Sequence, residues 1–589
     1  MENEIKARIR QQVDDEIAFC WKLELEKDRK LKEERRKLNH ELKEPSLLAC
    51  WENAANKDEL KNYSPYEILN FQKLNELGDA ELLIDRYKGK YLYDHQTKQW
   101  FMWNGIRFVE DKTDSIVRVP MNELAQLYED ALYKLNEMSV NEVSELEKEE
   151  RELSEKLENE TDELEQKFLK NELAAIQDKI KKTNAKGKNQ TKKLAERANQ
   201  LRTLTRSQKI VQTASKGIGS LGIPGDEWEK EPTLFVAANG IIDLETGKFL
   251  QPRYEQYLKK GSEVPYIGLL QCSDFWENHL QSVFCNNEEL MEYFEYCIGA
   301  SVTGLRTNKD IWCAYGPEAN NGKSSTFNTI LKIVGDYGTT IKVELLLDDA
   351  TKGSKGPDVD LVVIDGLRMG VASEAGDKAR FSSEKIKAIT GGDEIRARGM
   401  FENSRIIQST TKLWLHTNSI PKISSYDSGF MLRLKVIPFL AKFTPDKDLV
   451  DTAKHIYPAK NQEEFKRIIK ENEPYILSWI IRCARKYLLN QNYNTPDIVK
   501  GYTANYFIDN DIVGQFLKEK TVENNTGGNG VQVKTLYDGF VTYCKEEHGI
   551  QERNIKSMKN FAKEVENHGF NKKVSNKSYF TDLLLKSEM

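Results

Sequence analysis

Apolar positions recur at helical spacing at the start of the chain and give way to other patterns further along. Ile5, Ile9 and Val13 stand four residues apart in a region dense in charge. This spacing is that of an amphipathic helix. We therefore expect residues 1–70 to form an extended, charged helical arm with a solvated surface.

Residues 71–270 show short strand patterns and predict an α+β domain. Trp100–Phe108 has aromatic residues on both sides of an Asn-Gly pair, which is the sequence signal of a β-hairpin. Leu234–Leu244 contains a second Asn-Gly pair between apolar runs and predicts another strand–turn–strand element.

Residues 138–205 interrupt this domain with a helical pattern. Leucines near heptad spacing, such as Leu146 and Leu153, stand among Glu and Lys, and residues 183–190 are polar and contain a glycine. We expect a break in the helix at 183–190. Because the repeat is short and interrupted, it favours an inserted helical hairpin over a dimerising coiled coil.

The remaining segments alternate between helical and strand-rich patterns. They predict a helical collar at 271–305, a core with a central parallel sheet at 306–445, a helical linker at 446–500 and a C-terminal module at 501–589. The fold class is therefore multidomain α/β and α. The C-terminal module shows three helical stretches, the third at 553–567, followed by strand character, which is the pattern of a winged helix.

Composition restricts the class of protein only coarsely. The chain has 589 residues, a net charge of −6 and a pI near 5.9, so its surface as a whole is not suited to coating nucleic acid, although local basic patches remain open. The eight cysteines contain no C-x-x-C pair and no apolar run approaches membrane length. These features predict a soluble, cytoplasmic protein in a reducing compartment, without a zinc site or a membrane partner.

The strongest chemical signal is a phosphate-binding loop. The run Ile311–Tyr315 predicts a buried strand, a Gly-Lys-Ser sequence follows, and residues 326–334 predict a helix. In this context backbone amides hold phosphates, Lys323 reaches the outer phosphates and the Ser324 hydroxyl ligates Mg²⁺. The loop is one residue longer than the usual G-x-x-x-x-G-K-[ST] form. The predicted nucleotide-binding residues are Gly316, Asn320, Asn321, Gly322, Lys323, Ser324 and Ser325.

Two downstream acids are candidates for the carboxylate that ligates Mg²⁺ and activates water. Asp365 ends the apolar run 361–364, and Glu374 ends a second run at 368–373. Such a carboxylate is expected at the carboxyl end of the strand beside the strand of the phosphate loop. Both acids fit this pattern, so the residues by themselves leave the choice open.

Several polar residues further along the chain are candidates for contacts with a nucleotide or with the phosphate backbone of a nucleic acid. Arg396 and Arg398 alternate after a Gly-Gly turn, so they point to one face of a strand, and with Lys387 before the turn they could follow a phosphate backbone. Asn418 follows a predicted buried strand and could orient the attacking water. Arg433 stands alone in an apolar segment, where an arginine either pairs structurally or reaches a neighbouring subunit's nucleotide.

The third C-terminal helix predicts a basic surface. Lys556, Lys559 and Lys563 recur on one side, while Ile555 and Met558 are expected to face inward. A basic third helix of a winged helix suits contact with a DNA groove.

The ordered motifs resemble the superfamily 3 helicase domain. They are Gly-Lys-Ser, Val-Ala-Ser-Glu, Ile-Lys-x-Ile-Thr-Gly-Gly-Asp, Thr-Asn-x-x-Pro and Arg-Leu-x-x-Ile-Pro-Phe, in that order. More narrowly, residues 75–589 resemble the phage/plasmid primase–helicase family, which includes poxvirus-type helicases and initiators of staphylococcal pathogenicity islands. Upstream, Asp79-Ala80 and the Trp100–Phe108 hairpin extend this resemblance.

This resemblance implies an AAA+ ATPase with named roles. It implies that Glu374, rather than Asp365, is the catalytic carboxylate, that Asn418 is a sensor of the γ-phosphate, and that Arg433 is an arginine finger. It also implies DNA contacts from the hairpin after Asp393. Many relatives have paired arginines where this chain has Leu432-Arg433, and the chain departs from the family pattern there.

The function expected from these observations is that of an ATP- and Mg²⁺-dependent replicative DNA helicase and origin-binding initiator of a mobile element. It would act as a homo-oligomeric ring, most simply a hexamer. Relatives in this family often carry an N-terminal primase–polymerase domain. Because the highly charged segment before the shared region has only about 70 residues, too few for such a domain, no primase activity is expected. The alternatives are a DNA-binding ATPase switch or translocase without strand separation, and a P-loop enzyme that acts on small molecules.

Overall fold

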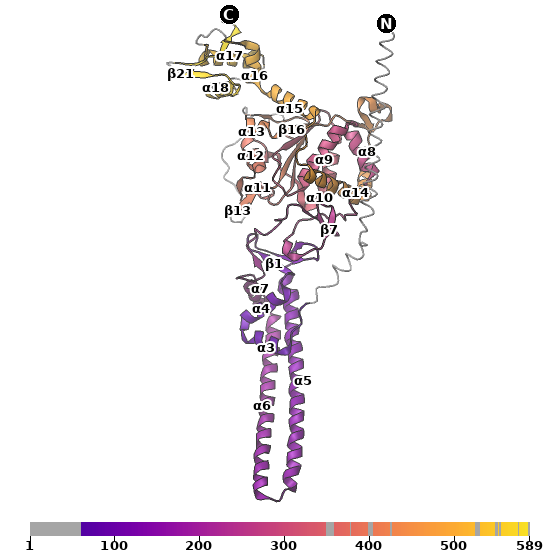
Figure 1. The fold of residues 1–589 in the computed structure, drawn as a ribbon, viewed down its shortest axis with the longest axis vertical. Coiled ribbons are helices and arrows are strands. Elements are labelled where there is room, and N and C mark those ends of the chain that lie inside the picture. Colours follow the sequence, from indigo (N-terminus) through magenta and orange to yellow (C-terminus); the bar gives the residue numbers. More distant parts are fainter. Residues whose placement is uncertain are drawn as a thin grey trace. The chain divides into compact units, whose positions relative to one another are not determined.

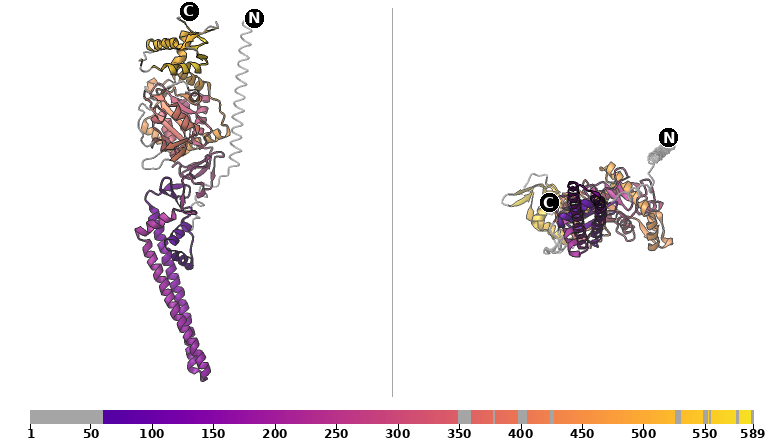
Figure 2. Two further views of the ribbon diagram at one scale, coloured as in Figure 1. Left: turned by 90° about the vertical axis from the view of Figure 1, so that its left-hand side faces the viewer. Right: turned by 90° about the horizontal axis from the view of Figure 1, so that it is seen from below.

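The structure is a computed structural model, and Figures 1 and 2 show its ribbon from three sides. It describes residues 60–348, 359–376, 379–397, 405–423, 427–524, 530–547, 552, 555–574 and 577–586. Most of the predicted N-terminal arm therefore lies outside the described residues. Contacts divide the chain into two units: one contains residues 60–91 and 112–221, and the other contains 92–111 and 222–589.

The first unit is helical. Helices α5 (Ser115–Asn159) and α6 (Glu163–Leu201) lie side by side as a long antiparallel hairpin (Figures 1 and 2). The shorter helices are α3 (Pro65–Lys73), α4 (Asn75–Tyr87) and α7 (Leu204–Ala214). At the hairpin's base Asp79 is fully buried, and its carboxylate accepts hydrogen bonds from Arg197 at 2.8 Å, Arg206 at 2.6 Å and Tyr128 at 2.7 Å. Three donors compensate for the burial of this charge.

The helical hairpin differs from its predicted limits in two ways. It begins at Ser115 rather than near 138, and α6 runs without interruption through the predicted break at 183–190. The chain reverses instead at 160–162, where the Asp162 side chain caps α6 by accepting from the Leu164 amide. Gly187 lies where a Cβ atom would be 2.5 Å from the Ser139 hydroxyl oxygen, so this glycine permits close packing of α5 on α6 and does not end the helix.

Two small sheets open the second unit, and the first of them is mixed because β1 pairs in parallel with β4. The predicted aromatic hairpin is present as β2 (Gln99–Trp103) and β3 (Phe108–Glu110), and Asn104 closes its turn by accepting from the Ile106 and Arg107 amides. β1 (Tyr91–Asp94) and β4 (Gly222–Ile223) complete this sheet. A three-stranded meander follows, formed by β5 (Leu234–Ala237), β6 (Gly240–Asp243) and β7 (Lys248–Leu250).

The predicted central parallel sheet is confirmed. Its five strands are ordered β16-β8-β14-β10-β9 and every pair is parallel. The strands are β8 (Ile311–Tyr315), β9 (Gly338–Thr340), β10 (Met369–Ser373), β14 (Lys412–Thr417) and β16 (Leu434–Pro438). The apolar run 361–364 is not one of them. It overlaps the short helix α11 (Val359–Val362) and the turn that follows it, so the reading of this run as a strand is wrong.

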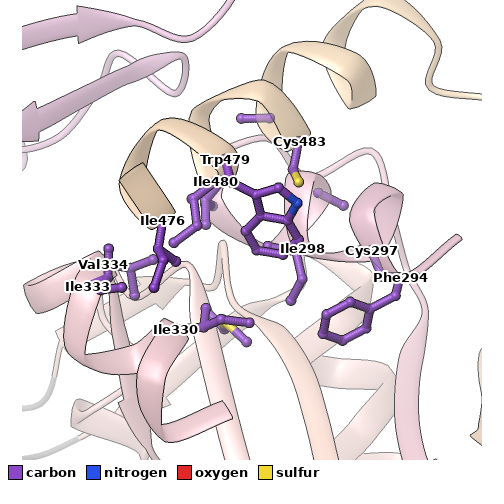
Figure 3. Packing of buried hydrophobic residues seen from close by; sticks show 14 of the residues in the cluster. Phe294, Cys297, Ile298, Ile330, Ile333, Val334, Ile476, Trp479, Ile480 and Cys483 are labelled. Atoms are coloured by element: carbon purple, nitrogen blue, oxygen red, sulfur yellow. The ribbon is translucent and has the colours of Figure 1, made fainter. Parts of the chain in front are cut away.

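One hydrophobic core joins the sheet to the segments predicted as collar and linker. Helices α8 (Asp274–Val283), α9 (Glu288–Val302), α10 (Lys323–Val334) and α14 (Gln462–Leu489) contribute to a single cluster with the sheet. Figure 3 shows Trp479 and Ile480 of α14 packed near Ile298 of α9 and Ile330 of α10. A Cβ atom on Gly299 would lie 2.1 Å from the Cys483 carbonyl oxygen. The backbones of α9 and α14 therefore touch, and both helices support the sheet directly.

The last part of the chain has a core of its own. After α15 (Asp497–Asn510), helices α16 (Ile512–Lys520), α17 (Val533–Glu546) and α18 (Met558–Asn567) enclose it together with short strands. β21 (Lys572–Val574) and β22 (Ser578–Phe580) pair as a hairpin, β20 (Val531–Gln532) pairs with β22, and β19 (Thr521–Glu523) pairs with β23 (Leu583–Leu585). The third helix begins at Met558, five residues later than predicted, and Met558 is exposed rather than buried.

Candidate nucleotide site at the carboxyl edge of the sheet

The predicted phosphate loop lies between β8 and α10. Gly322 has a φ of 82°, which glycine adopts without strain, and α10 begins at the next residue. A Cβ atom on Gly316 would lie 2.2 Å from the Asn321 amide nitrogen and 2.8 Å from the Lys323 ammonium. The loop therefore requires glycine at both ends, and it directs the first amides of a helix towards the space where phosphates would bind.

Lys323 is folded into the loop. Its side chain is buried, and its Nζ donates to the Gly316 carbonyl at 3.0 Å and to Asn418 Oδ1 at 2.7 Å. Burial lowers the pKa of Lys323 to about 8, because the charged form loses solvation that these two neutral acceptors restore only in part. An anion at the loop would supply the missing counter-charge.

The extra residue of the loop is accommodated by Asn321. This side chain is buried, and its amide donates to the Glu318 carbonyl at 2.7 Å and to the Gly316 carbonyl at 3.4 Å. Asn320 adopts a left-handed φ of 58° and is exposed. The Asn321 side chain thus braces the loop from inside, whereas Ser324 and Ser325 are exposed on the first turn of α10.

Strand register brings the other predicted residues to the same edge. Tyr315 is paired with Thr417, and Ser373 is paired with His416, so the residues that follow these strands lie at one carboxyl edge. They are Gly316, Asn418 and Glu374. Asn418 reaches Lys323 directly, while Glu374 is exposed and has a left-handed φ of 51°. A non-glycine residue in this conformation is typical of positions where a side chain must be aimed.

The expectation that the catalytic carboxylate follows the strand next to β8 is wrong. β14 lies between β8 and β10, so Glu374 stands two strand spacings, or roughly 10 Å, from the phosphate-loop strand. Asn418 occupies the position between them. Asp365 is not at the end of any strand of this sheet, so geometry separates the two acids that the pattern of apolar residues could not.

Arg433 lies at the opposite edge of the sheet. It precedes the first residue of β16, and its carbonyl accepts from the amide of Ile311, the first residue of β8. Its guanidinium donates to the Gly429 carbonyl at 2.7 Å and to the Thr390 hydroxyl at 3.2 Å. Five residues of β8 separate this edge from the phosphate loop, a distance of roughly 16 Å. Arg433 therefore cannot reach the loop of its own chain.

The hairpin predicted after the Gly-Gly turn is present. β12 (Glu394–Ala397) pairs antiparallel with β13 (Arg405–Gln408), and Arg396 is exposed on β12. Arg398 lies outside the described residues. Lys387 is not on the hairpin: it belongs to α12 (Ser383–Gly391) and forms an ion pair with Asp427 at 2.7 Å.

The basic face predicted for the third C-terminal helix is only partly formed. Lys559 and Lys563 are exposed on α18. Lys556 precedes the helix and its ammonium lies 2.6 Å from the carboxylate of Glu564, which is buried. Placing Lys556 on the outer stripe was wrong, because the helix begins two residues after it and its charge compensates a buried acid.

The sequence did not indicate two residues, Phe443 and His279, that contact the phosphate loop and the first turns of α10. The Phe443 amide donates to the Asn320 carbonyl at 2.7 Å, and a Cβ atom on Gly322 would touch the Phe443 ring at 3.1 Å. His279 lies 3.0 Å from the Thr326 hydroxyl on the first turns of α10, and burial lowers its pKa to about 4. Phe443 and His279 lie far from the loop in sequence, so no local pattern could have indicated them.

The residues present fit a magnesium-bound nucleotide. Among the residues that the structure describes, no group of three or more His, Cys, Asp or Glu side chains could hold a metal ion by itself. Ser324 is exposed on the first turn of α10, and Glu374 is exposed at the same carboxyl edge of the sheet, two strands away. A hydroxyl and a carboxylate suit Mg²⁺ that is shared with phosphate oxygens and water.

Comparisons with known proteins find relatives at low identity. Residues 80–285 match a family described as "D5 N terminal like". The chain is 24% identical over 330 residues to "Putative helicase L207/L206" of Acanthamoeba polyphaga mimivirus, over 55% of this chain and 34% of that protein. It is 24% identical over 335 residues to "Putative helicase 121R" of Invertebrate iridescent virus 3, over 54% of this chain and 35% of that protein. The chain spans about a third of the length of these relatives.

These similarities support a helicase-like family. The relatives named here are viral, and the narrower resemblance to staphylococcal initiators stays a prediction. Among solved structures, the apo C-terminal region of NrS-1 has a TM-score of 0.32 and 12% identity, over 54% of this chain and 77% of that chain. No helix in the described part of the chain has the length and apolarity needed to cross a bilayer.

Proposed function

We propose that this protein is an ATP-dependent replicative DNA helicase and origin-binding initiator of a mobile genetic element, which acts as a ring oligomer. The observation that carries this proposal is the meeting of Lys323, Asn418 and Glu374 at one edge of a parallel sheet, with Lys323 bonded to Asn418. The viral helicase relatives support the same function.

The chain's own residues supply four tasks at this edge. The amides from Gly322 onward and the Lys323 ammonium hold the phosphates, and the Ser324 hydroxyl and Glu374 hold Mg²⁺. The magnesium ion, when bound, neutralises charge that develops on the phosphate oxygens. Glu374 polarises the attacking water and Asn418 orients it, because its amide oxygen already contacts the lysine that binds phosphate.

The position of Arg433 supports the proposal of a ring assembly. Since it lies at the edge of the sheet opposite its own phosphate loop, it can stabilise transition-state charge only on a nucleotide held by a neighbouring subunit. We propose an AAA+ ring, most simply a hexamer, in which each subunit's Arg433 completes the next subunit's site. The hydrogen bonds that the guanidinium donates to the Gly429 carbonyl and the Thr390 hydroxyl hold it in place for this role.

Two surfaces would bind DNA. Hydrolysis would move the β12–β13 hairpin, which carries the exposed Arg396, along the phosphate backbone. Arg398, two positions later in the sequence, is proposed as a second contact. The C-terminal module would act as a winged helix, with Lys559 and Lys563 on α18 facing the DNA. Lys387 and Lys556 are held in ion pairs, so we assign them to positioning rather than to DNA contact.

The deciding experiment measures ATP hydrolysis and strand displacement together. We expect forked duplex DNA to stimulate hydrolysis and the protein to separate the strands only with ATP and Mg²⁺. Stimulated hydrolysis without strand separation would instead identify a DNA-binding ATPase switch or a translocase. An ATP hydrolysis rate that is the same with and without DNA would refute the proposal and favour an enzyme that acts on small molecules.

The shared site has its own test. The Arg433→Ala variant should lose hydrolysis by about 10³-fold, the effect typical of an arginine finger. Mixing it with an excess of Lys323→Ala subunits should restore part of the activity, because an intact phosphate loop then faces an intact arginine. Absence of rescue at every mixing ratio would contradict a site formed between subunits.

A further inference from the structure

The middle of α6 carries a dense group of positive charges that the proposed motor does not use. Seven lysines occur between residues 179 and 193, and no acidic residue occurs from 179 to 195. All seven side chains are exposed. Among the described residues only Lys182 of the seven forms an ion pair, with Asp178 one turn away.

Four of these lysines align on one face of the helix. Lys179, Lys182, Lys186 and Lys193 follow each other at spacings of three, four and seven residues, and such spacings return to the same side of an α-helix. We call these four residues the lysine stripe. At 1.5 Å per residue it extends for roughly 21 Å.

The partner helix does not neutralise the lysine stripe. Gly187 lies against Ser139 and Gln177 donates to Glu150, so residues 133–147 of α5 run opposite the stripe. This segment contains four glutamates and one lysine. None of those glutamates forms an ion pair with the stripe within the part of the chain that the structure describes.

Charge is instead separated along the hairpin. Residues 148–172, which include the tip and lie beyond the segment opposite the stripe, hold ten acidic and five basic residues, whereas 179–193 hold only positive charge. A hairpin stabilised merely by surface ion pairs would mix the two signs between its helices. This separation leaves a basic, rigid rod beside an acidic tip, and concentrated positive charge attracts a polyanion.

We propose that the lysine stripe on α6 binds the phosphate backbone of duplex DNA, as a contact separate from the hairpin β12–β13 and from the C-terminal module. A straight row of lysines about 21 Å long suits a duplex, which presents one phosphate charge per roughly 1.7 Å of its axis. Single strands are usually held by aromatic side chains on which bases stack, and residues 179–193 contain no aromatic residue. This contact has no sequence specificity, since it consists of lysines that bind phosphates and not base edges.

The test compares two variants of the full chain that lose the same charge. The first replaces the lysine stripe (K179Q/K182Q/K186Q/K193Q), and the matched control replaces four exposed lysines in the acidic part of the hairpin (K148Q/K156Q/K167Q/K170Q). Glutamine keeps helix propensity close to that of lysine, and circular dichroism should show equal helicity. Binding is measured without ATP, by fluorescence anisotropy with a 40-base-pair duplex of arbitrary sequence, between 50 and 200 mM KCl.

We expect the stripe variant to bind duplex DNA at least about tenfold more weakly at 150 mM KCl and to lower the magnitude of the salt slope by about 3.6, since four lost phosphate contacts contribute roughly 0.9 each. The control should stay within about twofold of wild type. Equal affinities of wild type and stripe variant, an unchanged slope or an equal loss in the control would overturn the proposal. Because ATP is absent, this result does not depend on whether the protein is a helicase.

A crosslinking experiment gives an independent answer. The photoreactive residue p-benzoylphenylalanine replaces Lys186 in one variant and Lys167, near the tip, in another. Irradiation with labelled duplex should crosslink the first and leave the second free. No crosslink at 186 in a protein that still binds DNA would overturn the proposal.

Discussion

The nucleotide site and the helical hairpin place their lysines in opposite environments. Lys323 is buried and held by two carbonyl-type oxygens on a sheet that is packed on both faces. The lysines of α6 between residues 179 and 193 are exposed to solvent on a hairpin of two helices. A buried lysine contributes through its position, so a single change removes its function. Exposed lysines contribute through their number, so several must change before an effect is seen.

The largest effect is expected at Lys323. Lys323→Ala should lower ATP turnover by about 10³-fold, because a preorganised charge in a desolvated site is lost. DNA binding by the rest of the chain should persist. The matched control is Lys447→Ala, an exposed lysine of the same unit, which should turn over normally. Normal turnover by Lys323→Ala in a colorimetric phosphate-release assay would show that the nucleotide site does not lie at this edge of the sheet.

The next effect separates the two acids. Glu374→Gln should lower turnover by about 10²-fold or more while nucleotide binding is retained, since it removes a general base but keeps the shape of the side chain. Asp365→Asn should change turnover less than threefold, because Asp365 does not follow a strand of the sheet. The opposite ranking of the two variants would return the catalytic role to Asp365.

A smaller effect is expected where α9 meets α14. Gly299→Ala places a methyl group 2.1 Å from the backbone carbonyl of Cys483, and since backbone cannot rotate away, the two helices must separate. We expect a loss of about 1–3 kcal/mol in the stability of this unit, as for other overpacked cores. Calorimetry of the full chain would detect it as a lowered midpoint of the corresponding transition.

The smallest effect is expected at Gly187 in the helical hairpin. A methyl group there meets only Ser139: its hydroxyl oxygen at 2.5 Å, which can change rotamer, and its Cβ at 3.2 Å, which needs a shift of a few tenths of an ångström. Alanine gains up to about 1 kcal/mol of helix propensity over glycine. Gly187→Ala should therefore leave stability unchanged or raise it slightly, as measured by hydrogen exchange of the α6 amides. Faster exchange throughout α6 would mean that this glycine is needed, as a break or a hinge.

Much of the architecture could be predicted from local patterns. The aromatic hairpin, the phosphate loop, the strand that ends at Asn418 and the hairpin after the Gly-Gly turn were each indicated by residues within about a dozen positions of one another. The errors fell where packing overrides local preference. A glycine in a polar stretch suggested a break in α6, but contact with α5 keeps the helix continuous. The apolar run at 361–364 suggested a strand, but it forms part of a short helix and a turn.

The sequence by itself determined which chemistry we propose for this chain, because a glycine-bounded loop with Lys323 and Ser324 between a strand and a helix is the pattern of a phosphate-binding loop. Only the tertiary structure decided which acid faces that loop and on which side Arg433 lies, because the order of strands in the sheet, β16-β8-β14-β10-β9, does not follow their order in the chain. Local periodicity specifies a strand's faces but not its neighbours, and neighbours determine which residues meet at an edge.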